Sequence, residues 1–169
     1  MGYWGYLVVG RAERPLAALD ALPGAEDGMS LRASAPGGWQ VWEYPGESGV
    51  GNMNDLAAQT GAPALFGYVM DGACVVVEAA APESGAWTTC LGRAAMAGYL
   101  GAEQNGLTLE DYFLEPPDAA ARAVTWAAEA GHPVRPGDLL GVLTAEPPAG
   151  NAEDLFFRLL DRLGVVARS

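Results

Sequence analysis

The chain has 169 residues, of which 50% are hydrophobic, so it can bury a sizeable core within one domain. Its 21 carboxylates outnumber nine arginines, and the formal net charge is −12. Such a surface repels phosphate backbones and anionic lipids, so we expect no nucleic-acid partner and no membrane partner. A basic protein would instead be attracted, although acidity also keeps an apolar-rich protein soluble.

Lysine is absent and His132 is the only histidine, which removes most chemistry that depends on amines or imidazoles. A P-loop and a pyridoxal site each need a lysine, and a multi-histidine metal site needs more than one imidazole. We therefore predict no metal and no cofactor. Isoleucine is missing as well. Because lysine and isoleucine codons are A/T-rich, a high-GC bacterial genome explains both gaps equally well.

The N-terminal sequence MGYWGYLVVGR lacks the basic region of a signal peptide, and its apolar stretch is too short for a membrane span. Cys74 and Cys90 form neither a C-x-x-C motif nor a disulfide framework. Both stand in apolar segments without cationic neighbours, so we expect buried, reduced thiols. These features indicate a cytoplasmic protein.

Apolar runs separated by turn residues predict strands and short helices up to Met70. Tyr3–Gly10 is apolar on both faces, as in a central strand. Pro15 suits the first turn of a helix, and Asn54 is expected to cap a second one. The helices are Arg14–Leu22 and Asn54 to Gln59 or Thr60, and the other strands are Met29–Ser34, Trp39–Tyr44 and Ala64–Met70.

A β-meander follows. Asp71-Gly72 lies between two apolar runs, and both residues tolerate positive φ, so we expect a two-residue hairpin turn of the primed type. Pro82-Glu83-Ser84-Gly85 makes the next turn. Pairing across that turn places Cys90 nearer to Val76 than to Cys74. The strands after Met70 are Ala73–Ala80 and Ala86–Leu91.

From Arg93 onward the pattern is helical. Asn151 is expected to cap the last helix, in which Asp154 and Arg158 stand one turn apart and can form an ion pair. Gly164 ends that helix. Its apolar stripe consists of Leu155, Phe156, Leu159, Leu160 and Leu163. The other helical segments are Arg93–Leu100, a start at the capping box Thr108-Leu109-Glu110-Asp111, an alanine-rich helix from Pro116 to before Gly131, and Pro136–Thr144.

The order β-α-β-β-α-β up to Met70 is that of the ferredoxin-like arrangement. We therefore predict an α+β fold with a mixed sheet of this kind, extended by the β-meander and followed by a C-terminal helical region. Residues 1–169 should form one domain. Within it, residues 1–91 build the sheet and residues 92–169 build mainly helices that pack on it.

Glu78, Cys90 and His132 are the candidates for acid, nucleophile and base in an enzyme. None of them lies beside a suitable partner in the sequence. Cys90 stands in an apolar strand, and His132 follows a helix, where a structural cap is the simpler role.

Two further groups of residues are candidate ligand sites. The glycine-rich run 46–51 precedes a helix and can cradle an anion, but its spacing matches no P-loop and Glu47 opposes phosphate. Four carboxylates crowd residues 110–118 without the calcium-loop pattern, and they suit helix starts instead. They are Glu110, Asp111, Glu115 and Asp118.

Large aromatics concentrate on two predicted strands. They fill the core if they turn inward, and they form a protein-binding patch surrounded by carboxylates if they face solvent. The aromatics are Trp4, Tyr6, Trp39, Trp42 and Tyr44.

Glu43 and Glu78 stand on otherwise apolar strand faces, where a carboxylate is exposed, paired with arginine, or buried with a raised pKa. The predicted binding residues are Trp39, Trp42, Tyr44, Glu43 and Glu78.

These features favour a non-catalytic, acidic protein-binding module. Its most concrete form is an immunity-type inhibitor that neutralises a basic toxin or nuclease. The alternative is a small-molecule-binding domain with Trp4, Trp39, Trp42 and Glu78 around a pocket. An enzyme that uses Glu78, Cys90 or His132 is the third hypothesis. The sequence leaves the identity of the partner and the oligomeric state open.

Overall fold

The structure is a computed structural model that describes residues 3–19, 28–45, 51–103, 109, 112–147 and 151–166. Four sequence predictions fall partly or wholly outside these residues. They are the end of the helix at Leu22, the glycine-rich run at 46–50, the capping box at Thr108, and the carboxylates Glu110 and Asp111.

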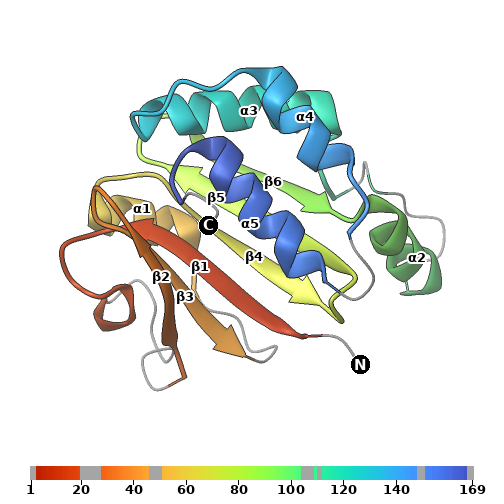
Figure 1. The fold of residues 1–169 in the computed structure, drawn as a ribbon, viewed down its shortest axis with the longest axis horizontal. Helices are drawn as coiled ribbons and strands as arrows, with labels where there is room; N and C mark the ends of the chain where they lie inside the picture. The colour runs from red at the N-terminus through yellow and green to blue at the C-terminus, as the bar shows by residue number, and fades with distance from the viewer. Residues whose placement is uncertain are drawn as a thin grey trace.

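Six strands form one sheet in the order β2-β3-β1-β4-β5-β6, and every neighbouring pair is antiparallel (Figure 1). Runs of valine, leucine and aromatic residues favour these strands, because such side chains pack well on a pleated surface. The strands are β1 (Gly5–Arg11), β2 (Ser30–Ala35), β3 (Trp39–Pro45), β4 (Ala64–Met70), β5 (Cys74–Ala81) and β6 (Gly85–Leu91).

Helices cover the two faces of the sheet unequally. Three of them, α3, α4 and α5, pack on one face, which we call the α5 face (Figure 1). The opposite face, called the α1 face, is covered in part by α1 and the short 3-10 helix η1. The helix α2 packs beside β5 and β6. The helices are η1 (Leu16–Ala18), α1 (Met53–Thr60), α2 (Arg93–Glu103), α3 (Pro116–Glu129), α4 (Pro136–Thr144) and α5 (Ala152–Leu163).

The predicted α+β class is confirmed, but the predicted mixed sheet is wrong. The strand β1 lies between β3 and β4, and both run opposite to it, so no parallel pair forms. The six-strand order also differs from a simple ferredoxin-like fold, because β5 and β6 extend the sheet beyond β4. The predicted helix Arg14–Leu22 does not form over its described part. Between β1 and residue 19 the chain forms only the three-residue η1, and Leu19 after it is extended, with ψ 143.

The first full helix starts earlier than predicted. Its N-cap is Asn52 rather than Asn54, because the Asn52 side chain accepts a hydrogen bond from the Asn54 N–H at 2.7 Å. Gly61 ends α1 in the left-handed region, at φ 70, where glycine carries no Cβ penalty.

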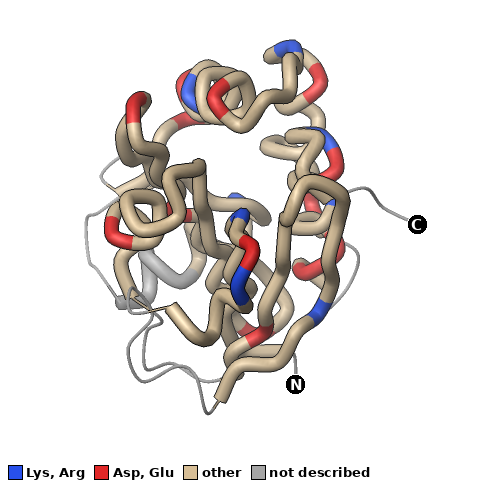
Figure 2. Tube along the Cα trace, turned by 90° about the vertical axis from the view of Figure 1, so that its left-hand side faces the viewer, with Lys and Arg blue, Asp and Glu red and all other residues tan. Residues whose placement is uncertain are grey.

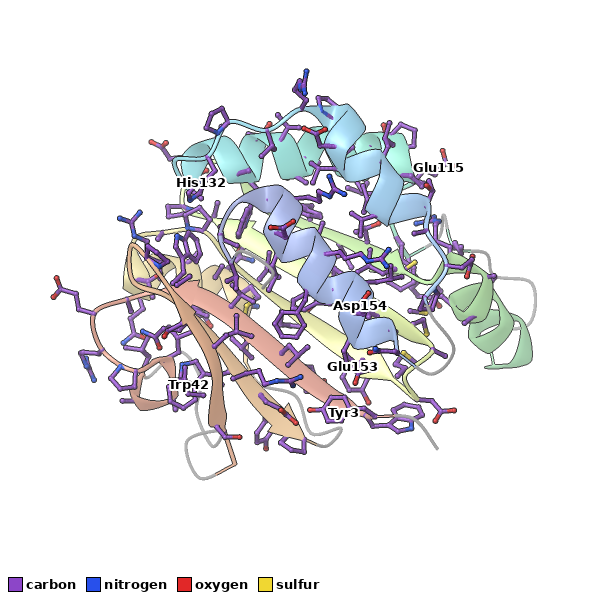
Figure 3. All side chains as sticks on the ribbon, in the orientation of Figure 1. Tyr3, Trp42, Glu115, His132, Glu153 and Asp154 are labelled. Atoms are coloured by element: carbon purple, nitrogen blue, oxygen red, sulfur yellow. The ribbon has the colours of Figure 1, made fainter. Side chains whose placement is uncertain are left out.

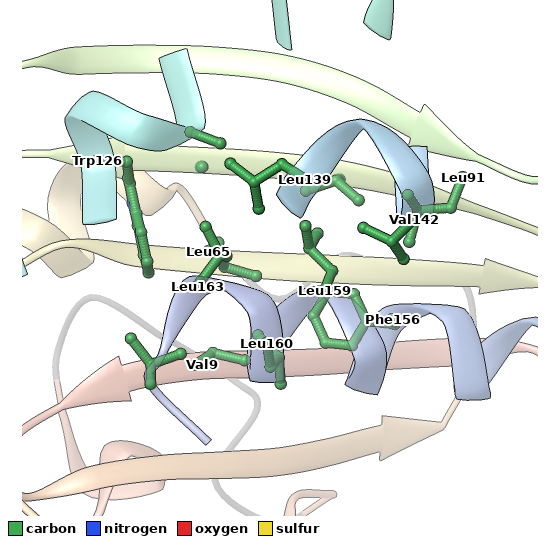
Figure 4. Packing of buried hydrophobic residues seen from close by; sticks show 14 of the residues in the cluster. Val9, Leu65, Leu91, Trp126, Leu139, Val142, Phe156, Leu159, Leu160 and Leu163 are labelled. Atoms are coloured by element: carbon green, nitrogen blue, oxygen red, sulfur yellow. The ribbon is translucent and has the colours of Figure 1, made fainter. Parts of the chain in front are cut away.

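The apolar stripe of α5 fills the centre of the larger core, between the sheet and helices α3 and α4 (Figure 4). All five residues of the predicted stripe are fully buried. Phe156 packs against Gly67 of β4, where an added Cβ would lie 2.6 Å from the ring. On the outer side of α5, Arg158 pairs with Asp154 at 3.0 Å, which confirms the predicted ion pair.

The turn between β4 and β5 has the predicted left-handed backbone. Asp71 has φ 55 and Gly72 has φ 62, and the Ala73 N–H donates to the Met70 carbonyl at 3.0 Å. The register pairs Met70 with Cys74, so three residues separate the paired positions instead of two.

The peptide groups of Gly72 link three distant parts of the chain. The Gly72 N–H donates to the Tyr3 carbonyl at 2.9 Å, and the Gly72 carbonyl accepts from the Ala152 N–H at 2.9 Å. Ala152 is the first residue of α5. The start of β1, the β4–β5 turn and the start of α5 therefore meet at one point, near Tyr3 and Glu153 in Figure 3.

Two side chains of α3 hold the turn between β5 and β6. The Glu129 carboxylate accepts hydrogen bonds from the N–H groups of Glu83 at 2.8 Å and Ser84 at 2.9 Å. Arg122 donates to the carbonyls of Ser84 at 3.3 Å and Ala86 at 2.8 Å. These bonds satisfy backbone groups at the end of an edge strand and attach α3 to it.

Gly67→Ala should destabilise the protein by about 1–3 kcal/mol, because the new Cβ would overlap the Phe156 ring, which is fully buried and cannot move aside. Gly141→Ala is the matched control. Gly141 lies within α4 with nothing within 4 Å of an added Cβ, so this change should be neutral or stabilise by up to about 1 kcal/mol. Urea unfolding measures both, and equal stability of Gly67→Ala and wild type would contradict the close packing.

Glu129→Gln should lower the free energy of unfolding at neutral pH by about 1 kcal/mol, a modest value because solvent screens this partly exposed carboxylate. Desolvation alone would raise the pKa of Glu129, but the hydrogen bonds from Glu83 and Ser84 lower it overall. Its contribution is therefore full above the ordinary value of 4.5 and is lost as pH falls through the lower folded pKa.

The difference between wild type and Glu129→Gln should thus shrink in acid, as measured by urea unfolding at several pH values. Glu146→Gln, at an exposed position after α4, is the control and should show little effect at any pH. A difference for Glu129→Gln that does not change with pH would contradict the carboxylate clamp.

Candidate binding face

Aromatic side chains gather on the α1 face of the sheet. The register places Tyr44 of β3, Tyr6 of β1 and Tyr68 of β4 side by side. Alternate residues of a strand point to the same side, so Trp42 and Phe66 share this face. The half-buried rings that contact one another are called the aromatic row, which consists of Trp4, Tyr6, Tyr44 and Tyr68, whereas Phe66 is buried.

Rings of the aromatic row contact each other along its length. Ring centroids lie 4.4 Å apart for Tyr6 and Tyr68, 6.4 Å for Tyr6 and Tyr44, and 6.4 Å for Trp4 and Tyr68. All four side chains are half-buried. The row therefore combines fixed ring positions with accessible ring surface, which is typical of aromatic anchors in protein interfaces.

The row continues toward the sheet edge through Trp42 and Leu31, which pair across β3 and β2. Leu31 is 54% exposed, and Trp42 is half-buried with its Nε1 donating to Gln40 at 2.7 Å. A hollow of about 280 Å³ lies between these residues and Pro15. This edge thus adds exposed apolar surface to the α1 face.

Glu78 is the single charged side chain on the α1 face among the described strand residues. It is exposed and borders a hollow of about 200 Å³ together with Asn52 and Thr88. Partial desolvation there raises its pKa. Three strand spacings, roughly 14 Å, separate β5 from β3, so Glu78 is not in contact with Trp42 or Tyr44.

Two of the predicted binding residues point to the opposite face. Trp39 is 2% exposed and packs in the core, with its ring centroid 6.0 Å from that of Trp126. The prediction of Trp39 as a binding residue is thereby corrected, because the odd-numbered residues of β3 face α5. Glu43 shares that face and pairs with Arg32 at 2.9 Å.

The Glu43–Arg32 pair belongs to a structural group at the start of β1. The Arg32 guanidinium lies over the Phe157 ring, 5.4 Å from its centroid. Burial raises the pKa of Tyr3 well above its usual range, and the neighbouring Glu43 carboxylate raises it further. This group attaches β1, β2 and β3 to α5, and it keeps the Glu43 carboxylate paired with Arg32 within the protein.

The structure does not bring all three enzyme candidates together, because Glu78 and Cys90 are diagonal neighbours on adjacent strands whereas His132 lies elsewhere. Glu78 and Cys90 lie on the α1 face. His132 follows α3 on the other side of the sheet and contacts Gly164, where an added Cβ would lie 3.1 Å from the imidazole (Figure 3). Its backbone N–H donates to the Ala127 carbonyl at 2.8 Å, in keeping with the predicted role at a helix end.

Both cysteines are fully buried, and the register places Cys90 opposite Val76 as predicted. Burial raises the pKa of Cys74 to about 12 and that of Cys90 to about 11. The expectation that no cation lies nearby is wrong for Cys90, because Arg93 Nη1 approaches its Sγ to 3.7 Å. Arg93 stands in the helix after β6, and its effect on the pKa is smaller than that of burial.

The Asp and Glu residues of the described chain are distributed over several of its elements instead of gathering at one place (Figure 2). Most described arginines are held by other groups of the chain. Arg32, Arg135 and Arg158 form ion pairs with carboxylates, and Arg11, Arg14, Arg93 and Arg122 donate to backbone carbonyls. The excess carboxylates therefore set the long-range field, while the aromatic row gives the position of the candidate face.

Among the residues that the structure describes, no three His, Cys, Asp or Glu side chains converge in a metal-binding group. Within the same residues, no helix combines the length and the apolar character needed to cross a bilayer.

Comparison with protein-family models, with curated proteins and with solved structures finds no match to this chain. Fold and surface thus define the class: an acidic α+β protein with a six-stranded antiparallel sheet.

Native protein should react only slowly with a thiol reagent at pH 8, because Cys74 and Cys90 are buried and their raised pKa values keep both thiols protonated. Unfolding in denaturant should release both thiols, which provides the control for reagent and stoichiometry. Absorbance from an aromatic disulfide reagent measures the rate. Rapid labelling of Cys90 in the folded protein would contradict its burial and revive the enzyme hypothesis.

Proposed function

We propose that the protein is a non-catalytic binding module for a basic protein, which it contacts through the α1 face. The observation that carries the proposal is the half-buried aromatic row, continued by Trp42 and the exposed Leu31, in a chain of net charge −12. Tyrosine and tryptophan provide many of the strongest anchors in protein interfaces. An immunity-type inhibitor of a basic toxin or nuclease is the concrete form of this proposal.

Charge and aromatic surface would act at different stages of binding. Dispersed carboxylates attract a basic protein over a distance and raise its association rate. The aromatic face then provides apolar contact area that fixes the complex and slows dissociation. Trp42, Tyr44 and Glu78 are the predicted binding residues that this proposal retains.

We also propose that residues 3–70 are a variant of the ferredoxin-like arrangement. Two observations support this relationship: the partial order β2-β3-β1-β4, and the packing of both η1 and α1 on one face. In this variant the first helix is reduced to η1 within the described residues.

The small-molecule alternative has weaker support. Its predicted pocket does not assemble, because Trp39 faces the core and Glu78 lies three strands from Trp42. The hollows beside Trp42 and Glu78, of about 280 and 200 Å³, are smaller than most ligand sites, which span roughly 300–1,000 Å³.

The test starts with capture of a basic protein from a lysate of the source cell, followed by its identification and purification. The association rate constant of the purified pair should fall as salt rises, because screening weakens the attraction. Trp42→Ala should weaken the complex by about 2 kcal/mol, roughly 30-fold in Kd, as expected for a central anchor. Surface plasmon resonance measures both quantities.

Tyr112→Ala is the matched control, since Tyr112 is 47% exposed but lies away from the aromatic row, and its Kd should equal that of wild type. Wild-type affinity for Trp42→Ala would place the interface elsewhere. Turnover of a metabolite that is lost in Glu78→Gln would overturn the non-catalytic proposal.

A further inference from the structure

We infer that the aromatic row binds the guanidinium group of an arginine side chain on the basic partner. This inference rests on the proposed function and names the chemistry by which the α1 face would recognise its partner. The faces of tyrosine and tryptophan rings carry negative electrostatic potential and attract cations. Tyr6 and Tyr68 lie 4.4 Å apart by their centroids, Tyr44 and Trp4 lie beside them at 6.4 Å, and all four rings are half-buried.

The charges around the row favour a cation. Glu78 is the charged side chain that the strands contribute to this face, and Asp55 is exposed on α1, which packs on it. Arg14, just before η1, and Arg93, in α2, are engaged elsewhere: Arg14 donates to the Ala18 carbonyl and Arg93 to that of Leu114. A cation on the row would therefore come from another molecule.

The same chain already shows this type of contact on its other face. The Arg32 guanidinium lies 5.4 Å from the Phe157 ring centroid while it pairs with Glu43 at 2.9 Å. Its two partners are an aromatic ring and a carboxylate. The α1 face offers both kinds of group, with several rings in contact and the Glu78 carboxylate on the same side of the sheet.

Arginine fits the row better than lysine. A guanidinium is planar and stacks on ring faces. It is also more weakly hydrated than an ammonium group, so it loses less hydration free energy when it leaves water. From Tyr44 to Tyr68 the row spans two strand spacings, roughly 10 Å. An extended segment with arginines at alternate positions, roughly 7 Å apart, would place two guanidinium groups on it.

The experiment uses the full chain and three labelled peptides: one alternating arginine with glycine, its lysine counterpart, and its citrulline counterpart, which keeps the shape of arginine without the charge. Fluorescence anisotropy gives each Kd. The arginine peptide should bind about three-fold or more tightly than the lysine peptide, and the citrulline peptide should show no binding. Tyr44→Leu should weaken arginine binding about three-fold or more, whereas Tyr44→Phe keeps the ring and should stay within about two-fold.

Tyr112→Leu, which removes an exposed ring elsewhere, should leave all three affinities unchanged. Thermal unfolding checks that each variant is folded. For a variant that is not, the measurement is made on wild type: tyrosine ring resonances should shift with the arginine peptide and not with the citrulline peptide.

Equal affinity for the arginine and lysine peptides, together with wild-type binding by Tyr44→Leu, would overturn the inference. Electrostatic attraction would then be the remaining support for the proposed function. Equal losses in Tyr44→Phe and Tyr44→Leu would also overturn it, because the hydroxyl would then be the binding group. If neither basic peptide binds, the inference fails, while the proposed function is still decided by the captured protein and the Trp42→Ala variant.

Discussion

The packing of α5 on the sheet is the contact on which the rest of the structure depends. Five large apolar side chains of this helix are fully buried, and each contributes roughly 1.5–3 kcal/mol by leaving water. Close approach is possible because β4 carries Gly67 where the Phe156 ring lies. With α3 and α4 beside α5, one face of the sheet becomes a closed core, whereas the opposite face combines a smaller core with the half-buried aromatic row.

Along β3, the side chains that stabilise the fold alternate with the side chains of the candidate binding face. Trp39 and Glu43 point toward α5, where one fills the core and the other pairs with Arg32. Trp42 and Tyr44, on the same strand, point to the α1 face and remain half-buried. One strand therefore supplies aromatic side chains both to the core and to the candidate binding face, because neighbouring residues of a strand point to opposite faces of the sheet.

Local patterns predicted the elements well, since an apolar stripe, a capping proline or an Asp-Gly pair acts within a few residues. The last helix, α3, α4 and the β4–β5 turn all lie where the sequence indicated. The pairing of β1 with β3 and β4 is non-local, so the mixed sheet could not be excluded from sequence. For the same reason the sequence could not say which side of β3 is covered, and Trp39 was assigned wrongly. Phe66 and Tyr68 alternate in a predicted strand, and that spacing was the signal that could have added Tyr68 to the site.

The meeting point at Gly72 has a consequence for how the chain is made. Tyr3 and Ala152 both bond to Gly72, so the first strand and the last helix are fixed to one turn in the middle of the sequence. Of the three helices that cover the α5 face, α5 is synthesised after α3 and α4, and until it emerges the part of the sheet around Gly67 lacks its cover. Such transiently exposed apolar surface promotes aggregation, so the nascent chain is vulnerable between the completion of β6 and the docking of α5.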